Sequence, residues 1–226
     1  MTLPKPRAVI FDWDDTIIDS WGPSLQSLNV TLAAMGEKPW DDAEARRRAG
    51  PSARDLFREM FGDRWQEADK IFFDALRSLF REHLPVYPDV EPVLKTLAEN
   101  NVYMAVVSNK RGPLLREEAK DAGFNHYFGK IVGAGDAAAD KPDPAPVRMA
   151  LEGSGIAPGS DVWFIGDSHT DMLCAANAGC LGLLIETKPP PEETLRGHAP
   201  LRPGWQVIPN CETSAPACNL KIANAL

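Results

Sequence analysis

The sequence predicts an α/β fold, a doubly wound (Rossmann-like) parallel five-stranded sheet with the order 5-4-1-2-3 and an inserted all-helical domain. Three observations carry this prediction: short, continuously apolar runs, helical patterns between the later runs, and a long helical interval between the first two. Continuous hydrophobicity is typical of strands covered on both faces, as in parallel sheets. Strands that alternate with helices are typical of doubly wound folds.

The five apolar runs are short, and several end at polar or glycine residues. The first stops at a group of acids, and the second stops at a serine followed by an asparagine. Their composition is rich in β-branched and aromatic residues, which favours strands. The runs are residues 7–11, 102–107, 130–132, 162–165 and 181–185.

Helices are expected between the later strands, because each interval carries a start or stop signal. Asp89 is expected to cap the first of them. Gly123 and Gly179 are expected to end two others, since glycine readily adopts the left-handed conformation after a helix. The helices are expected after Asp89, from about Pro113, after Pro144 and after Thr170.

The interval between the first two strands breaks this alternation. It shows no convincing strand, but its apolar residues follow the 3-and-4 spacing of helices, as over residues 65–80. A plain crossover needs only about a dozen residues, so the interval is interpreted as an inserted helical domain. The expected domains are residues 1–19 with 87–210 for the α/β core, residues 20–86 for the insert, and residues 211–226 for a tail.

The composition excludes some partners. The formal net charge is −8, whereas nucleic-acid binders normally carry a basic face, so no nucleic acid is expected. No apolar run approaches the roughly 20 residues that span a membrane. The apolar stretch before Asp12 is too short for a signal peptide, so we expect a cytoplasmic protein. The residues leave the oligomeric state open.

The four cysteines form no C-x-x-C pair, which argues against a zinc ribbon or a redox motif. In the expected compartment they are interpreted as reduced thiols. A disulfide or metal clip through the last two remains an open alternative. The cysteines are Cys174, Cys180, Cys211 and Cys218.

Acidic residues gather at the ends of two predicted strands. Asp12, Asp14 and Asp15 directly follow the first strand, and such a group is unfavourable unless a cation or a function compensates it. Ligands of open α/β sheets bind at the carboxyl ends of strands, at the switch point, which here lies between strands one and four. Asp167 and Asp171 would therefore join Asp12 and Asp14. Four carboxylates in one crevice predict a hard divalent cation, and the absence of a His cluster favours Mg²⁺ over zinc.

These motifs, in this order, resemble those of the haloacid dehalogenase superfamily, in its phosphatase branch with a helical cap. The resemblance covers residues 7–185 and is greatest to phosphoglycolate phosphatases. The insert also falls where this family places its cap. The motif residues are Asp12, Asp14 and Thr16 in D-x-D-x-T, Ser108 after the second strand, Lys141, and Gly166-Asp167-Ser168 with Asp171.

The resemblance implies a magnesium-dependent phosphatase that hydrolyses a small phosphate monoester from a phosphorylated metabolite. Asp12 would be the nucleophile and form an aspartyl-phosphate. Asp14 would be the general acid and base. Mg²⁺ would contact the Asp12 side chain, the Asp14 backbone carbonyl and the Asp167 side chain.

The resemblance also implies supporting roles for other motif residues. Ser108, the backbone N–H of Asn109 and the ammonium of Lys141 would bind phosphate oxygens. Asp171 would orient metal-bound water or the lysine, and Thr16 would orient the acid of the first motif.

The predicted insert contains arginines around residue 50. They are expected either to bind a carboxylate or second phosphate of the substrate, or to form an ordinary solvated helix face. Asp15 is a departure, because this branch commonly has Gly there. Asp tolerates unusual backbone angles better than most residues. The arginines are Arg46, Arg47, Arg48 and Arg54.

Asp14 favours ester hydrolysis, because dehalogenases and phosphonate-cleaving members of this family usually lack that acid. Two alternatives stay open. A phosphosugar mutase of the same superfamily would give an isomerised product without free phosphate. A non-enzymatic binding protein on this fold would release no phosphate with magnesium. The substrate itself cannot be read from the residues.

Overall fold

The computed structural model describes residues 5–48, 53–185 and 206–208. The chain divides into two compact units. The α/β unit comprises Met1–Ile17 and Val86–Leu226, and the helical unit comprises Ile18–Pro85. The predicted tail, residues 211–226, lies outside the described residues, as do Cys211 and Cys218.

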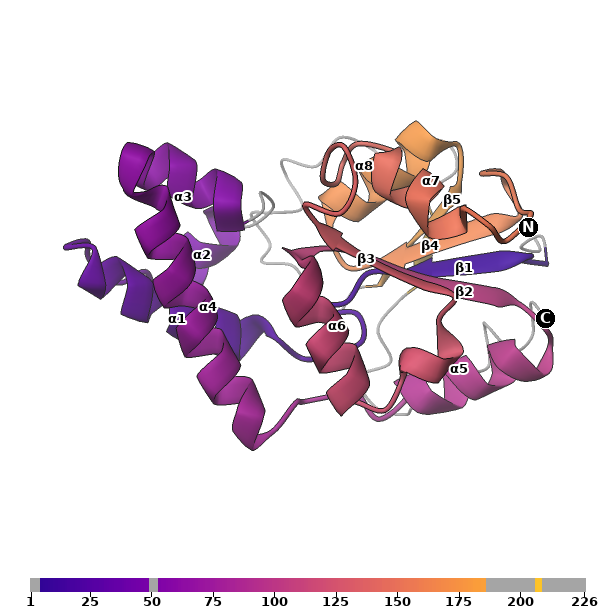
Figure 1. Cartoon of the computed structure of the whole chain (residues 1–226), viewed down its shortest axis with the longest axis horizontal. Coiled ribbons are helices and arrows are strands. Elements are labelled where there is room, and N and C mark those ends of the chain that lie inside the picture. Colours follow the sequence, from indigo (N-terminus) through magenta and orange to yellow (C-terminus); the bar gives the residue numbers. More distant parts are fainter. Residues whose placement is uncertain (1–4, 49–52, 186–205, 209–226) are drawn as a thin grey trace. The chain divides into compact units, whose positions relative to one another are not determined.

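The α/β unit is built on a parallel sheet (Figure 1). Within the described residues the sheet has six strands, in the order β3-β2-β1-β4-β5-β6. Its first five strands follow the predicted order, read from the opposite edge, so the predicted fold class is confirmed. The sequence did not reveal β6, because three residues are too few to form a recognisable apolar run. The strands are β1 (Ala8–Phe11), β2 (Tyr103–Arg111), β3 (Lys130–Ala134), β4 (Val162–Gly166), β5 (Leu181–Ile185) and β6 (Gln206–Ile208).

Helices cover both faces of this sheet, with α5 and α6 on one face and α7 and α8 on the other (Figure 1). All four begin close to the predicted positions. Asp89 occupies the predicted N-cap position of α5, but its carboxylate makes no capping hydrogen bond. Asp89 has helical backbone angles, whereas a capping residue is usually extended. The helices are α5 (Val90–Glu99), α6 (Gly112–Asp121), α7 (Ala145–Leu151) and α8 (His169–Ala178).

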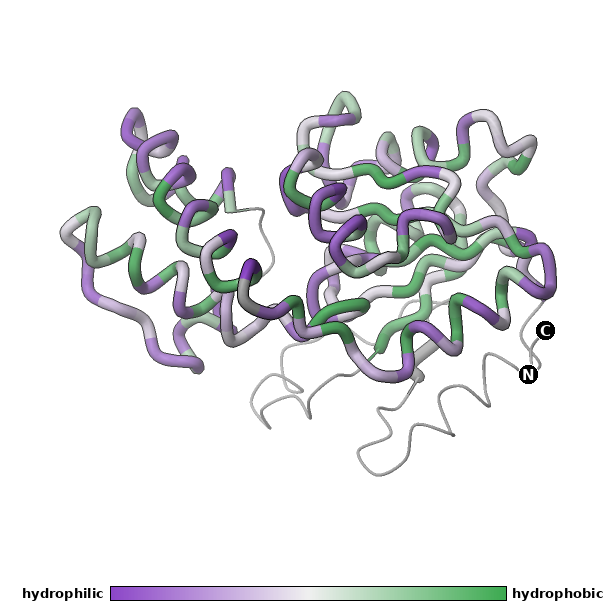
Figure 2. The backbone as a smooth tube through the Cα atoms, turned by 60° about the horizontal axis from the view of Figure 1, so that its bottom comes forward, coloured by the Kyte–Doolittle hydropathy of each residue, from purple (hydrophilic) through white to green (hydrophobic). Residues whose placement is uncertain are grey.

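The continuous apolar runs are explained by burial on both faces of the sheet. Every residue of β1 and β4 is buried. Ile10 and Phe164 join Val147 of α7 and Ala175 of α8 in one apolar cluster. Figure 2 shows hydrophobic colour along the strands and alternating colour along the helices, as expected for amphipathic helices packed on a sheet.

The helical unit has its own core. Leu28 and Leu32 of α1 pack with Phe57 of α3 and Ala68 of α4. The helical content predicted for the insert is therefore confirmed. Among the described residues, no helix is both long enough and apolar enough to cross a membrane. The helices are α1 (Trp21–Ala34), α2 (Asp42–Arg48), α3 (Ala53–Phe61) and α4 (Trp65–Glu82).

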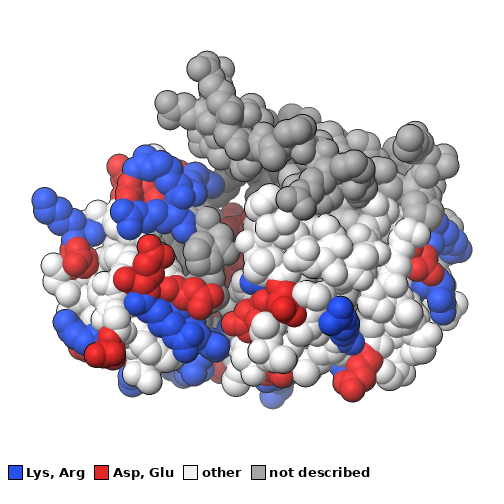
Figure 3. Space-filling model, turned by 90° about the horizontal axis from the view of Figure 1, so that it is seen from above, with Lys and Arg blue, Asp and Glu red and all other residues white. Residues whose placement is uncertain are grey.

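Charged side chains of both signs are interspersed on the face of the molecule shown in Figure 3. Over the described residues of that face, Lys and Arg side chains lie next to Asp and Glu side chains.

Candidate active site

Asp12 and Asp167 lie close together because they follow paired strands. Phe11 of β1 is in register with Ile165 of β4, and the Asp12 N–H donates to the Ile165 carbonyl at 2.8 Å. Carboxylate oxygens of Asp12, Asp167 and Asp171 lie within 4.8 Å of one another. The structure thus brings these predicted residues together at the switch point between β1 and β4.

Lys141 is bonded to two of these carboxylates. Its ammonium donates to Asp12 Oδ1 at 2.7 Å and to Asp171 Oδ1 at 2.6 Å. All three side chains are buried. Burial lowers the pKa of Lys141, but the charges of Asp12 and Asp171 outweigh it, so the pKa lies above its ordinary value. Lys141 is therefore a fixed positive charge beside the predicted nucleophile.

Asp171 is positioned by the first turn of α8. Ser168 is the N-cap, and its hydroxyl accepts a hydrogen bond from the Asp171 N–H at 3.3 Å. Asp171 Oδ2 in turn accepts from the Ser168 N–H at 3.0 Å and from its hydroxyl at 2.5 Å. This is a capping box. One carboxylate oxygen of Asp171 therefore takes part in capping the N-terminus of α8, while the other accepts a hydrogen bond from Lys141.

Gly166 leaves the space that Asp171 occupies. A Cβ at position 166 would lie 2.5 Å from Asp171 Cγ, which is far closer than atoms can approach. Gly166→Ala should therefore displace the Asp171 carboxylate and destabilise the protein by about 1–3 kcal/mol. Urea unfolding will measure this loss.

Gly22→Ala is the matched control for that substitution. Nothing lies within 4 Å of a Cβ at position 22, which is inside α1. Alanine should be neutral or stabilising there, by up to about 1 kcal/mol. Equal stability of the two variants would contradict the close packing at Gly166.

The side chain of Asn109 makes two hydrogen bonds with the backbone of Lys141. The Asn109 amide donates to the Lys141 carbonyl at 3.1 Å, and the Lys141 N–H donates to Asn109 Oδ1 at 2.9 Å. Ser108, at the same end of β2, is buried and its hydroxyl accepts from the Lys110 N–H at 3.1 Å. The predicted phosphate-binding residues Ser108 and Asn109 are thus neighbours on β2, and Asn109 links this strand to the backbone of Lys141.

Asp14 faces a different partner from the other acids. Its Oδ1 accepts a hydrogen bond from Lys110 Nζ at 2.7 Å, and the same ammonium donates to Glu118 Oε2 at 2.7 Å. The hydroxyl of Thr16 is buried, and no hydrogen bond to it is made within the described part of the chain. Asp15 has a left-handed φ of 54°, so the position does require the backbone that Gly adopts easily.

The sequence reasoning missed Lys110 and Glu118. A signal for Glu118 was present, because it lies three residues after Leu115 and four after Leu114, on the apolar face of the predicted helix. A charged residue on such a face is rarely buried without a partner.

The closeness of these acids raises the pKa of two of them, the buried Asp12 and the half-buried Asp167. Burial, followed by the charge of Asp171, raises the pKa of Asp12 to about 7, although Lys141 opposes the shift. Burial, followed by the charges of Asp12 and Asp171, raises the pKa of Asp167 well above its ordinary value. A cation would relieve this repulsion, and carboxylate oxygens are the ligands of hard divalent ions. The residues therefore fit a divalent metal.

Three of the predicted arginines are engaged on their own helix, α2. Arg46 Nε lies 2.7 Å from Asp42, and Arg48 Nε lies 2.7 Å from Glu44, which also binds Arg47. Arg54 is half-buried on α3. Whether any of these arginines binds a substrate stays a prediction.

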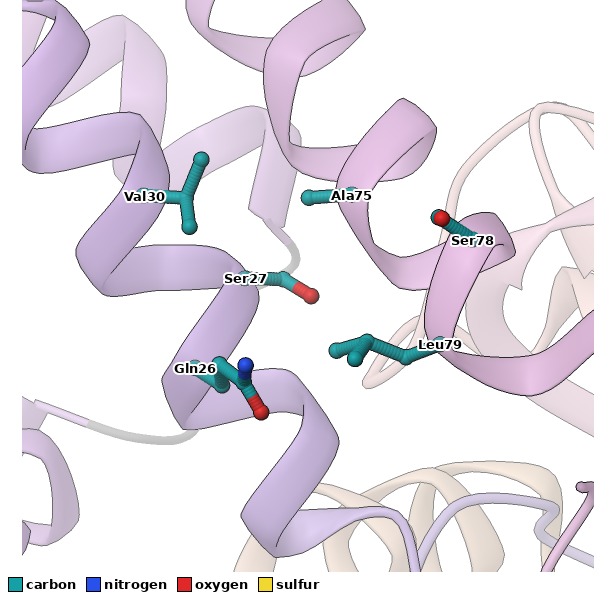
Figure 4. Close-up of a pocket in the computed structure, with 6 residues that line it drawn as sticks. All are labelled: Gln26, Ser27, Val30, Ala75, Ser78 and Leu79. Atoms are coloured by element: carbon teal, nitrogen blue, oxygen red, sulfur yellow. The ribbon is translucent and has the colours of Figure 1, made fainter. Parts of the chain in front are cut away.

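A pocket of about 190 Å³ lies between α1 and α4 within the helical unit (Figure 4). No charged side chain lines it, so it offers no counter-charge for a phosphate. Its lining residues are Gln26, Ser27, Val30, Ala75, Ser78 and Leu79.

Comparison with known proteins places this fold and site in a family. Residues 9–185 match the model of haloacid dehalogenase-like hydrolases. Phosphoglycolate phosphatase 1 of Pseudomonas aeruginosa is 32% identical over 183 residues, which cover 77% of this chain and 67% of the relative. Phosphoglycolate phosphatase of Neisseria meningitidis serogroup A is 32% identical over 186 residues, 78% of this chain and 79% of the relative.

A solved structure agrees with these matches. The crystal structure of a HAD-superfamily hydrolase from Ehrlichia chaffeensis is 34% identical and superimposes with a TM-score of 0.59, covering 82% of this chain and 90% of that one. The matches define a hydrolase of phosphoric monoesters. The chain belongs to the haloacid dehalogenase-like hydrolases, and the resemblance seen in its motifs is confirmed.

Proposed function

We propose that this phosphatase is magnesium-dependent and hydrolyses a small phosphate monoester through an aspartyl-phosphate on Asp12. The observation that carries the proposal is the 2.7 Å contact between Asp12 Oδ1 and Lys141 Nζ. This contact lies within the cluster of acids that Asp12 forms with Asp167 and Asp171. A buried carboxylate held by a lysine, with further acids beside it, suits attack on an anionic phosphate.

In the first step, an Asp12 oxygen attacks phosphorus and the bond between phosphorus and the leaving oxygen breaks. Asp14 donates a proton to that oxygen, so an alcohol leaves. In the second step, water attacks the phosphorus, and Asp14 takes its proton. The bond between Asp12 and phosphorus then breaks, which releases phosphate and regenerates the carboxylate.

The remaining residues compensate the negative charge of Asp12 and of the phosphate. Lys141 compensates the phosphate and Asp12, and Asp171 orients this ammonium through its 2.6 Å hydrogen bond. The side chains of Asp12 and Asp167 and the backbone carbonyl of Asp14 would hold Mg²⁺. When bound, the ion would neutralise the repulsion between the nucleophile and the phosphate.

For the substrate we propose a phosphorylated metabolite with a carboxylate, such as phosphoglycolate. The relatives from Pseudomonas aeruginosa and Neisseria meningitidis are named phosphoglycolate phosphatases. An arginine of the helical unit would supply the counter-charge for the carboxylate.

Magnesium removal tests the metal part of this proposal. We expect free phosphate from phosphoglycolate and from 4-nitrophenyl phosphate with millimolar Mg²⁺, background release with excess chelator, and recovery when Mg²⁺ is added back. Without the cation the buried acids hold protons more tightly, and Asp12 is a poorer nucleophile. Equal rates with and without chelator would exclude the metal, and an isomerised product without free phosphate would exclude hydrolysis.

A further inference from the structure

The buried contact between Lys110 and Glu118 holds the loop that carries Asp14. Lys110 lies at the end of β2 and Glu118 lies one turn before the end of α6. Lys110 Nζ is 2.7 Å from Asp14 Oδ1 and 2.7 Å from Glu118 Oε2. Charged side chains are seldom buried unless they are paired, so this contact ties the β2–α6 segment to the loop after β1.

The same carboxylate holds the neighbouring residue of that loop. The indole N–H of Trp13, a fully buried residue, donates to Glu118 Oε2 at 2.7 Å. Glu118 thus restrains Trp13 directly and Asp14 through Lys110. Two successive residues of the loop are fixed from one point on α6.

The side chain of Asp14 is more exposed to solvent than the side chains of the residues that hold it. The side chains of Lys110 and Glu118 are 3% and 4% exposed, whereas that of Asp14 is 31% exposed. Of these three side chains, that of Asp14 alone is accessible to a substrate. Because Lys110 bonds to Oδ1, the other oxygen, Oδ2, stays available to carry a proton.

We infer that Lys110, supported by Glu118, is a positioning residue that holds Asp14 in the orientation needed to protonate the leaving group. The inference rests on the proposed function, in which Asp14 is the general acid. A correctly placed acid matters most when the leaving group is a poor one, because a good leaving group departs without a proton.

The test compares phenyl phosphate, a poorer leaving group, with 4-nitrophenyl phosphate in the full-length protein with Mg²⁺. Its readout is kcat/KM, which depends only on substrate binding and the first phosphoryl transfer, to Asp12, and not on the later hydrolysis of the aspartyl-phosphate. The variant is Lys110→Met with Glu118→Gln. Gln can still accept from Trp13, and no unpaired buried charge remains, so the fold is preserved.

We expect kcat/KM of this double variant to fall more for phenyl phosphate than for 4-nitrophenyl phosphate, by a factor on the order of 10 or more. Glu118→Gln alone leaves Lys110 beside Asp14 and keeps a neutral acceptor for its ammonium, so the ratio of the two esters should change less than in the double variant. Lys130→Met removes a lysine from an ion pair with Glu152 elsewhere in the unit and should also keep that ratio.

Equal losses on both esters would mean that Lys110 only stabilises the loop, and the inference would be overturned. An unchanged double variant would overturn it as well. If the wild type released phosphate from neither ester, the proposed function would fail and the inference with it. The two failures are therefore distinguishable from the wild-type rates alone.

Discussion

Asp12→Asn is expected to lower phosphate release by about 10⁴-fold or more, because an amide is neutral and a poor nucleophile. The amide oxygen can still accept a hydrogen bond from Lys141, so the fold should persist. Phosphate release from phosphoglycolate with Mg²⁺ measures the loss, and urea unfolding checks the fold.

Asp161→Asn is the matched control, since it replaces another carboxylate of the α/β unit by an amide. Asp161 is partly exposed and lies 3.6 Å from Arg7 in a surface ion pair. Surface pairs of this kind contribute about 0–1 kcal/mol, so activity and stability should remain near those of the wild type. Normal turnover by Asp12→Asn would show that another group attacks phosphorus.

Lys141→Met is expected to reduce both turnover and stability. The substitution leaves the buried carboxylates of Asp12 and Asp171 without their shared ammonium. Breaking a buried pair from one side costs about 3–5 kcal/mol, and loss of one charged partner of the phosphate lowers turnover by about 10²–10³-fold. Urea unfolding and phosphate release are the measurements.

Magnesium should restore part of the stability lost by Lys141→Met, because a cation can replace some of the missing positive charge. It should not restore turnover. Lys141→Arg should be a poor substitute, since a planar guanidinium does not fit the space of a compact ammonium whose side chain is 4% exposed. Wild-type stability of Lys141→Met in chelator would show that the lysine does not balance these acids.

The sheet could be predicted because its burial is regular. β1 and β4 are buried along their whole length, which forces an unbroken apolar run in each. β6 could not be predicted, because three residues leave no pattern. The side chain of Asp89 also departed from expectation, since a capping residue type does not by itself establish the extended backbone that capping needs.

The candidate site was predictable where its residues follow strand ends. Asp12 and Asp167 meet because β1 and β4 pair in register. The partners of these residues were harder to predict. The bond between Lys110 and Asp14 spans 96 positions of the chain, and no local pattern encodes it. The Asn109 side chain likewise bonds to a backbone 32 positions away.

The shared duty of Asp171 has a consequence for how the protein can change. Its carboxylate both starts a helix and balances a lysine, so rigidity and reactivity depend on the same three atoms. Asparagine at 171 would preserve an acceptor for the serine but remove half of the lysine's counter-charge. A substitution at position 171 that changes the stability of α8 therefore also changes the counter-charge of Lys141, so the stability and the activity of the protein vary together at this position.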